Sequence, residues 1–274
     1  MSAGRLVVCP TPIGNLEDIT LRVLSALREA DVVACEDTRR TRVLLDRYGV
    51  SGRLVSYHEH NERARAAELV AHMRDGAVVA LVSDAGMPLV SDPGYVLVQA
   101  CVADGLPVEV LPGPSAAITA LVASGLPADE WHFHGFLPRK KGELRELLSH
   151  GDGTLVAFES PRRLPATLAL AAELDPVREV TVCRELTKVH EEIVRGTAAE
   201  LAARYADNPP KGEIVLVLAP PASAGAGAGG PDPAAVDALR KLVEAGAHPR
   251  KAAAVVSSLT GASANSLYRA LTSE

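Results

Sequence analysis

The chain has 274 residues, of which 47% are hydrophobic and 3% aromatic, and its formal net charge is −6. This length suits two domains with a short appendage, and the hydrophobic content is sufficient for a sizeable core. The negative charge argues against a protein that coats nucleic acid non-specifically. The shortage of aromatic residues argues against recognition of bases stacked across a sheet surface.

Compartment and metal content are constrained by several negative features of the sequence. No segment approaches the ~18 continuous apolar residues of a membrane span, and residues 1–5 lead directly into a strand, so we expect a cytoplasmic protein. The four cysteines lie far apart in apolar runs, which suits reduced packing residues; they are Cys9, Cys35, Cys101 and Cys183. His58 and His60 lack a third ligand at a useful spacing, so we predict no metal site.

In the first part of the chain, apolar strands alternate with amphipathic helices. The strands begin near Leu6, Val32, Val78 and Val108, and the helices are expected at residues 19–30, 41–48, 62–74, 95–103 and 115–124. This alternation predicts a mostly parallel sheet, whose strand ends all carry loops rich in Gly, Pro and polar residues. Because ligands bind at the carboxyl ends of such strands, the four loops predict a cleft at one edge of the sheet.

The loop at residues 83–94 is the most specialised of the four. Gly86 and Gly94 permit positive φ or close approach to a ligand, and Asp84 and Asp92 offer hydrogen-bond acceptors. Taken alone, the loop is equally consistent with a structural turn. Neither G-x-G-x-x-G after a strand nor G-x-x-x-x-G-K-[ST] occurs, which argues against a Rossmann dehydrogenase or a P-loop enzyme.

The second part predicts another α/β domain, a linker and a helical tail. Strands are expected at 131–135, 154–158, 179–183, 191–195 and 213–218, with helices at 142–149, 161–173 and 198–206, which together indicate a mixed sheet. We therefore predict α/β domains at 1–125 and 126–220, a flexible Gly/Ala linker at 221–232 and a tail at 233–274.

The tail reads as three short helices at 233–245, 249–259 and 263–271, a pattern that fits a helix-turn-helix-like module. It could contact RNA through Arg250, Lys251, Asn265 and Arg269, or form a small bundle that docks on the rest of the protein. The sequence supports both interpretations equally.

Six ordered motifs carry a resemblance to a known family. They are PTPIGNLEDIT at 10–20, ACEDTRR at 34–40, SDAGMP at 83–88, PGPS at 112–115, FESPRR at 158–163 and CRELTKVHE at 183–191. Together they resemble the tetrapyrrole methylase superfamily and, within it, the ribosomal RNA small subunit methyltransferase I family. The resemblance implies S-adenosylmethionine as methyl donor, bound in a cleft between two α/β domains.

The resemblance also implies the acceptor, the partners and the cofactor residues. The family methylates the 2'-hydroxyl of a cytidine in the decoding centre of 16S rRNA, with the 30S subunit as the expected form of the substrate and a homodimer as the expected assembly. Position by position, the residues implied to bind the cofactor are Ile13, Gly14, Asp84, Gly86, Met87, Pro88, Ser115, Ala116, Ser160, Pro161, Arg184 and Leu186.

Methyl transfer from a sulfonium requires positioning and a group that accepts the proton of the hydroxyl. The candidate bases are Glu36, Asp37, Glu159, Glu185 and Glu191, and Lys188 or Arg184 could stabilise developing negative charge on the oxygen. The sequence does not distinguish among these bases, and each could instead form an ordinary ion pair.

Three basic clusters are candidate phosphate contacts: Arg39, Arg40 and Arg42; Arg139, Lys140 and Lys141; and Arg162 with Arg163. The alternative for each is a solvated helix face. Two rival functions remain open. One is another enzyme of the superfamily, acting on a tetrapyrrole or a protein, and the other is a ribosome-binding protein without catalysis.

Overall fold

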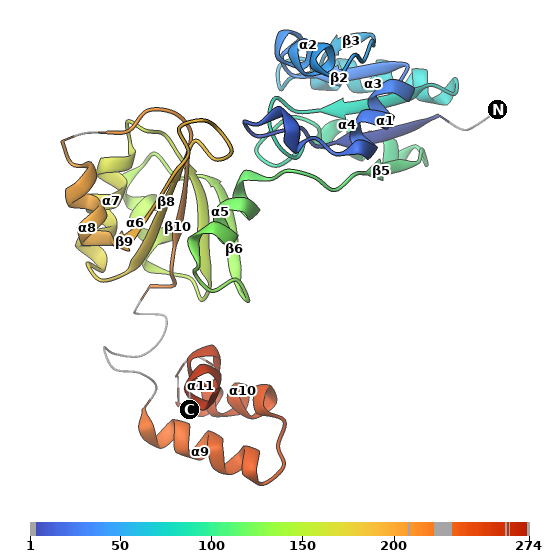
Figure 1. Ribbon diagram of the computed structural model, residues 1–274. Coiled ribbons are helices and arrows are strands. Elements are labelled where there is room, and N and C mark those ends of the chain that lie inside the picture. Colours follow the sequence, from blue (N-terminus) through green and yellow to red (C-terminus); the bar gives the residue numbers. More distant parts are fainter. Residues whose placement is uncertain (1–3, 208, 222–231, 261, 263, 273–274) are drawn as a thin grey trace. The chain divides into compact units, whose positions relative to one another are not determined.

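The computed structural model describes residues 4–207, 209–221, 232–260, 262 and 264–272 (Figure 1). The chain divides into one unit made of Met1–Ala120 with Arg184–Glu192 and a second made of Leu121–Cys183 with Ile193–Glu274. The sequence-based division at 125/126 lies close to this boundary. It assigned residues 184–192 to the second domain, whereas their contacts group them with the first unit.

The first unit contains a five-stranded sheet in the order β3-β2-β4-β1-β5, and its neighbouring strands are parallel. The strands are β1 (Arg5–Cys9), β2 (Val32–Cys35), β3 (Leu54–Ser56), β4 (Val78–Val82) and β5 (Val108–Val110). The predicted parallel sheet is confirmed. The sequence analysis missed β3, because three half-buried residues at the sheet edge are too short to show an alternating pattern.

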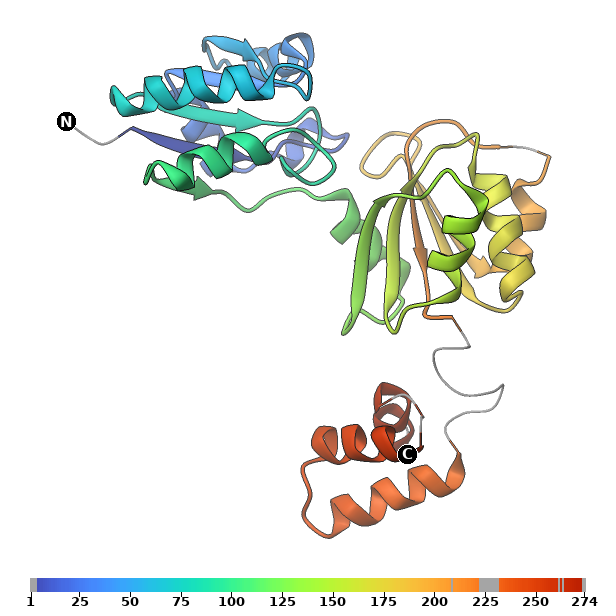
Figure 2. The same cartoon turned by 180° about the vertical axis from the view of Figure 1, so that it is seen from behind.

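Helices cover both faces of this sheet. They are α1 (Leu21–Glu29), α2 (Thr38–Arg47), α3 (Glu62–Arg74) and α4 (Tyr95–Ala103); the 3-10 turn η1 (Leu16–Asp18) precedes α1, and α5 (Ala116–Ser124) follows β5 and crosses the division between units. The apolar sides of α1 and α2 pack on one face, and those of α3 and α4 pack on the other (Figures 1 and 2). Burial on both faces explains why the central strands β1, β2 and β4 are almost continuously apolar.

Side-chain caps fix where two of these helices begin. The Thr20 hydroxyl accepts a hydrogen bond from the Val23 N–H at 3.1 Å and starts α1. The Asp37 carboxylate accepts from the Arg39 N–H at 2.8 Å, so α2 begins at Thr38, three residues before the expected start. Such caps satisfy amide groups that have no partner within the helix.

The second unit contains a mixed sheet, as predicted, and its strand order is β6-β7-β10-β8-β9. Its elements are β6 (Trp131–Phe136), α6 (Lys141–Ser149), β7 (Thr154–Glu159), α7 (Leu164–Leu174), β8 (Glu179–Arg184), β9 (Glu192–Thr197), α8 (Ala198–Tyr205) and β10 (Ile214–Leu218). Leucines and alanines of α6, α7 and α8 form one core with the strands. The helix expected from residue 161 begins only at Leu164, because 160–163 form a turn.

All four cysteines are buried and free, as expected. Burial raises the pKa of the Cys9 thiol to about 12 and that of Cys101 to about 11. High thiol pKa values make these side chains inert packing groups.

The tail forms α9 (Pro233–Glu244), α10 (Pro249–Thr260) and α11 (Ala264–Thr272), which share a small apolar core of their own. The Arg250 guanidinium lies 5.5 Å from the centre of the Tyr268 ring, so this candidate RNA contact already has a partner. Most of the predicted linker, and the side chains of Asn265 and Arg269, lie outside the described residues.

Within the described part of the chain, no helix is both long and apolar enough to cross a membrane. The same residues contain no group of three or more His, Cys, Asp or Glu side chains that could hold a metal ion. His58 and His60 pack edge to face, with ring centres 5.8 Å apart.

Arg178 is a buried cation that joins two parts of the second unit. Its Nε donates to the Ala219 carbonyl and its Nη1 to the Leu148 carbonyl, both at 2.6 Å. Burial lowers its pKa to about 10, with the nearby Asp175 charge acting in the opposite direction. The guanidinium therefore satisfies carbonyls just beyond β10 and near the end of α6.

Arg178→Ala is expected to lower the free energy of unfolding of the second unit by about 2–4 kcal/mol, because two carbonyls lose a buried charged donor. Urea unfolding followed by fluorescence of Trp131, the single tryptophan of the chain, measures this locally because Trp131 lies in β6. The control Arg139→Ala, at an exposed position, should change the free energy of unfolding by less than about 0.5 kcal/mol. Equal stability of the two variants would contradict the assigned role.

Candidate active site

The loops after β1 and β4 are joined by reciprocal backbone hydrogen bonds at the carboxyl edge of the first sheet. The Thr11 N–H donates to the Gly86 carbonyl and the Gly86 N–H donates to the Thr11 carbonyl, each at 2.9 Å. The Thr11 hydroxyl also donates to the Ser83 carbonyl, and the Ser83 hydroxyl donates to the Gly86 carbonyl, both at 3.0 Å. Both loops are therefore held in one conformation.

Gly86 is the point at which three predicted cofactor loops meet. Its φ is +82°, and a Cβ there would lie 3.4 Å from Ile13 Cγ2 and 3.8 Å from the Pro114 carbonyl oxygen. The third loop leads into α5, whose first turn includes a hydrogen bond from the Thr119 N–H to the Ser115 carbonyl at 2.9 Å. The loops after β1, β4 and β5 thus form one backbone cradle.

Asp84 connects this cradle to the loop after β2. Its carboxylate accepts from the Asp37 N–H at 3.0 Å and lies 3.3 Å from Arg40 Nη1. The Asp84 side chain is 19% exposed, so one part of it bonds within the protein while another part faces solvent. The Arg39 guanidinium pairs with the Asp37 carboxylate, and the Arg39 backbone N–H donates a hydrogen bond to it. Together they hold the pKa of Asp37 well below its usual range.

Glu36, Asp84 and Asp92 form an acidic group at the same edge. Burial, together with the charges of Asp84 and Glu59, raises the pKa of Glu36. Burial and the charge of Glu36 raise the pKa of Asp92 to about 6, against a hydrogen bond from Ser83 that lowers it. Burial beside other carboxylates disfavours the charged form, so Glu36 and Asp92 keep their protons to a higher pH than ordinary carboxyl groups.

The segment at 184–192 packs on the loop after β1. The Asn15 N–H donates to the Thr187 hydroxyl at 3.0 Å, and a Cβ on Gly14 would lie 2.5 Å from Lys188 Cγ. Glu185 and Thr187 have positive φ values of +51° and +67°, which residues other than glycine rarely adopt. Strained backbone of this kind is concentrated at functional sites.

Hydrogen bonds stabilise the strained segment from within. The Thr187 N–H donates to the Glu191 carboxylate at 2.6 Å, and the Lys188 ammonium lies 2.9 Å from Glu185 Oε1. Arg184 lies 3.4 Å from Glu192 Oε2. Of the candidate residues in this motif, Glu185 and Lys188 thus pair with each other, Glu191 accepts a backbone hydrogen bond and Arg184 pairs with Glu192.

A cavity of about 620 Å³ lies between this segment and the first loop. It is lined by Gly14, Asn15, Leu16, Glu17, Arg47, Glu185, Thr187, Lys188, Val189 and His190. Of these, sequence reasoning named only Gly14, Glu185 and Lys188 as site residues; it missed the others, because only the fold brings the end of α2 and the 184–192 segment to the same place. The lining carries both acids and cations, which suits a ligand with both kinds of polar group.

In the second unit, Glu159 is fully engaged in hydrogen bonds. Its carboxylate accepts from the Thr167 hydroxyl and the Ser160 N–H, each at 2.7 Å, and lies 3.3 Å from Arg163 Nη2. The side chain has no exposed surface. This geometry favours a structural role over that of a base, while the next two residues, Ser160 and Pro161, are half-buried in the following turn.

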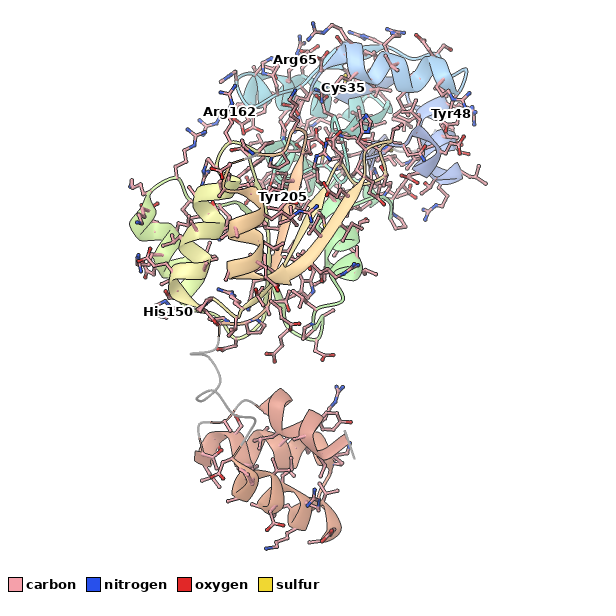
Figure 3. The ribbon with its side chains drawn as sticks, turned by 60° about the vertical axis from the view of Figure 1, so that its left-hand side comes forward. Cys35, Tyr48, Arg65, His150, Arg162 and Tyr205 are labelled. Atoms are coloured by element: carbon pink, nitrogen blue, oxygen red, sulfur yellow. The ribbon has the colours of Figure 1, made fainter. Side chains whose placement is uncertain are left out.

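The predicted phosphate contacts differ in their surroundings. Arg39, Arg40, Lys140 and Arg163 each form an ion pair, with Asp37, Asp84, Glu143 and Glu159 respectively. Arg42, Arg139, Lys141 and Arg162 are exposed, and no ion pair to them occurs within the described residues. Arg162 points outward from the turn before α7 (Figure 3).

The pair of α/β units and the loop cradle define a class of methylase. Residues 5–202 match the family described as Tetrapyrrole (Corrin/Porphyrin) Methylases. Among solved structures, the methyltransferase CobJ covers 82% of this chain and 97% of its own at a TM-score of 0.59 and 22% identity. Uroporphyrin-III C-methyltransferase from Thermus thermophilus, complexed with S-adenosylhomocysteine, covers 78% of this chain and 97% of its own. Its TM-score is 0.55 and its sequence identity is 23%.

Closer similarity is found among relatives named ribosomal RNA small subunit methyltransferase I. The protein from Mesorhizobium japonicum is 48% identical over 97% of this chain and 90% of its own length. The protein from Thermotoga maritima is 46% identical over 78% of this chain and 98% of its own length. The protein from Escherichia coli O157:H7 is 44% identical over 98% of this chain and 94% of its own length. The chain therefore belongs to the ribosomal RNA small subunit methyltransferase I branch of the tetrapyrrole methylase family.

Asp92→Asn tests the acidic group through the pH dependence of stability. Because the folded pKa of Asp92, about 6, exceeds its ordinary value of 3.8, wild-type stability is lost as pH rises through this range. Above about pH 6 the variant should gain about 1–2 kcal/mol of unfolding free energy relative to wild type, and the gain should vanish below about pH 4.

Urea unfolding followed by circular dichroism, repeated from pH 4 to 8, would measure this difference. The matched control is Asp129→Asn, which changes an exposed carboxylate outside any helix or strand. A difference between Asp92→Asn and wild type that does not vary with pH would show that Asp92 ionises normally in the folded protein.

Proposed function

We propose that this protein transfers a methyl group from S-adenosylmethionine to the 2'-hydroxyl of a cytidine in the decoding centre of 16S rRNA. The observation that carries the proposal is the 48% identity, over 97% of the chain, with a relative named ribosomal RNA small subunit methyltransferase I. The cradle of loops at Gly86 supports it, since ligands bind at the carboxyl edge of such parallel sheets.

The residues of the first unit fit the proposed cofactor. Ile13, Gly86 and the loop before Ser115 meet in a cradle whose backbone can approach a ligand closely. The nearby carboxylates of Asp84 and Asp92 suit a ligand that carries an ammonium and a sulfonium. The full proposed set adds Gly14, Met87, Pro88, Ala116, Arg184 and Leu186 in this unit, and Ser160 and Pro161 in the second.

The cofactor supplies an electrophilic methyl group, so the protein must orient the hydroxyl and accept its proton. Among the candidate bases, Glu36 combines partial exposure with a raised pKa. Asp37 is a weaker base because Arg39 and the cap bonds stabilise its charge, and Glu159 is buried. We therefore assign proton acceptance to Glu36, with Glu185 and Glu191 as the alternatives.

Lys188 is the candidate for stabilising negative charge on the attacking oxygen, since it lies in the cavity lining beside Glu185. The exposed cations Arg42, Arg139, Lys141 and Arg162 are the proposed phosphate contacts, because their charges are available to RNA. The family resemblance supports the 30S subunit as the form of the substrate and a homodimer as the assembly.

Labelled S-adenosylmethionine, incubated with the protein and unmodified 30S subunits, tests the reaction. Alkali cleaves RNA through the 2'-hydroxyl, so ribose methylation should leave the label in an alkali-resistant dinucleotide that contains cytidine. Label in mononucleotides would indicate base methylation instead. No label in RNA would contradict the proposal and redirect the search to tetrapyrrole or protein acceptors.

Glu36→Gln is expected to lower kcat for this transfer by roughly a hundredfold or more, because the amide cannot accept the proton. The affinity for S-adenosylmethionine, measured by calorimetry, should stay close to that of wild type. Glu59→Gln, which removes a neighbouring exposed charge and keeps the Glu36 carboxylate, is the matched control and should lower kcat far less. If Glu185→Gln lost the activity and Glu36→Gln kept it, the assignment would move to Glu185.

A further inference from the structure

All three phenylalanines of the chain gather at one place in the second unit. Phe133 and Phe136 lie in β6, and Phe158 lies in the adjacent parallel strand β7. The ring of Phe158 is 5.1 Å from that of Phe133 and 5.5 Å from that of Phe136, centre to centre, both edge to face. Phe133 and Phe158 are half-buried, whereas Phe136 is 63% exposed.

A β-bulge directs the exposed ring. The pairing of β6 with β7 shifts between Phe133 and Phe136, and Gly135 within the shift has a φ of +72°. Without the bulge, residues three apart would point to opposite sides of the sheet, yet both Phe133 and Phe136 contact Phe158. The bulge therefore places a large apolar side chain at the surface that the core does not require.

The backbone that follows Phe136 is held firmly. The Leu137 N–H donates to the Phe158 carbonyl at 3.1 Å. Arg163 donates to the carbonyls of Leu137 at 3.0 Å and Pro138 at 2.5 Å, which joins the loop after β6 to the turn after β7. A fixed aromatic ring loses little conformational entropy when a ligand stacks on it.

Exposed cations follow the same two strand ends. Arg139 lies in the loop after β6, Lys141 is the first residue of α6, and Arg162 lies in the turn after β7. Because β6 and β7 are parallel, these loops leave the same edge of the sheet, and Arg163 bonds across them. The Phe136 patch (Phe136, Arg139, Lys141 and Arg162) thus combines one exposed ring with positive charge.

We propose that Phe136 stacks on an unpaired base of the RNA substrate while Arg139, Lys141 and Arg162 contact the flanking phosphates. This inference rests on the proposed function and specifies how the second unit holds an unpaired part of the RNA substrate. Stacking on an aromatic ring beside cations is the usual way in which proteins hold unpaired nucleotides. The positive charge favours a polyanion over a second copy of this acidic chain, whose net charge is −6.

The test uses the full chain and 30S subunits assembled with transcribed, unmodified 16S rRNA. Phe136→Ala should weaken binding to these subunits roughly five- to a hundredfold, the range expected for loss of one stacked base. Phe136→Leu, which keeps the apolar bulk and loses the aromatic face, should weaken it similarly. Phe136→Trp should bind within about twofold of wild type, as should the control Val177→Ala, which alters a side chain that is 72% exposed in the same unit.

The salt dependence of binding separates the two kinds of contact. Arg139→Ala should reduce the slope of log Kd against log salt concentration by about one, because it removes a phosphate contact. Phe136→Ala should leave the slope unchanged. Trp131 fluorescence and the affinity for S-adenosylmethionine, both unchanged in Phe136→Ala and Phe136→Leu, would show that the fold and the cofactor site are intact; for Phe136→Trp, which adds a second tryptophan, the affinity for S-adenosylmethionine is the check.

Unchanged affinity of Phe136→Ala for the subunits would overturn the stacking proposal. It would also be overturned if Phe136→Ala changed the sedimentation of the free protein and Phe136→Leu restored it, since the patch would then bind a second copy. Wild-type transfer of label to RNA is scored separately. Transfer with unaffected Phe136→Ala binding would refute stacking alone, whereas wild type that neither binds nor methylates the subunits would refute the proposed function as well.

Discussion

The reciprocal hydrogen bonds between Thr11 and Gly86 are the contact on which the loops at the carboxyl edge of the first unit's sheet depend. They join the loops after two adjacent central strands, and they work only because β1 and β4 are parallel neighbours that end at the same level. Once these loops are fixed, the loop after β5 packs beside Gly86, and Asp84 reaches the amide of Asp37 in the loop after β2.

This arrangement concentrates carboxylates where solvent is scarce. The loops at the strand ends bring Glu36, Asp84 and Asp92 close together. Burial and the repulsion between the carboxylates raise the pKa values of Glu36 and Asp92. Carboxylates perturbed in this way are costly to the stability of the fold, which is why such groups are characteristic of functional edges and uncommon elsewhere. The same edge can therefore hold a cationic ligand and accept a proton.

In the second unit, internal hydrogen bonds fix the backbone that carries exposed side chains. Glu159 and Arg163 are both bound within the unit. Glu159 accepts a hydrogen bond from the turn after β7, and Arg163 donates to the carbonyls of the loop after β6. Sequence reasoning placed both residues at the surface of a site. Their structural use leaves Arg139, Arg162 and Phe136 as the groups that face outward on fixed backbone.

The sequence by itself determined the alternation of strands and helices, the parallel and the mixed sheet, the loops that carry polar residues and the family, because periodicity, turn residues and ordered motifs are local. It did not reveal β3, the start of α2, the membership of residues 184–192 or the burial of Glu159. These depend on partners distant in the chain, as when Asp84 meets Asp37 across 47 positions or Asn15 meets Thr187 across 172. Only the tertiary structure decides which charges are paired, since strand order and not sequence spacing sets the distances between them.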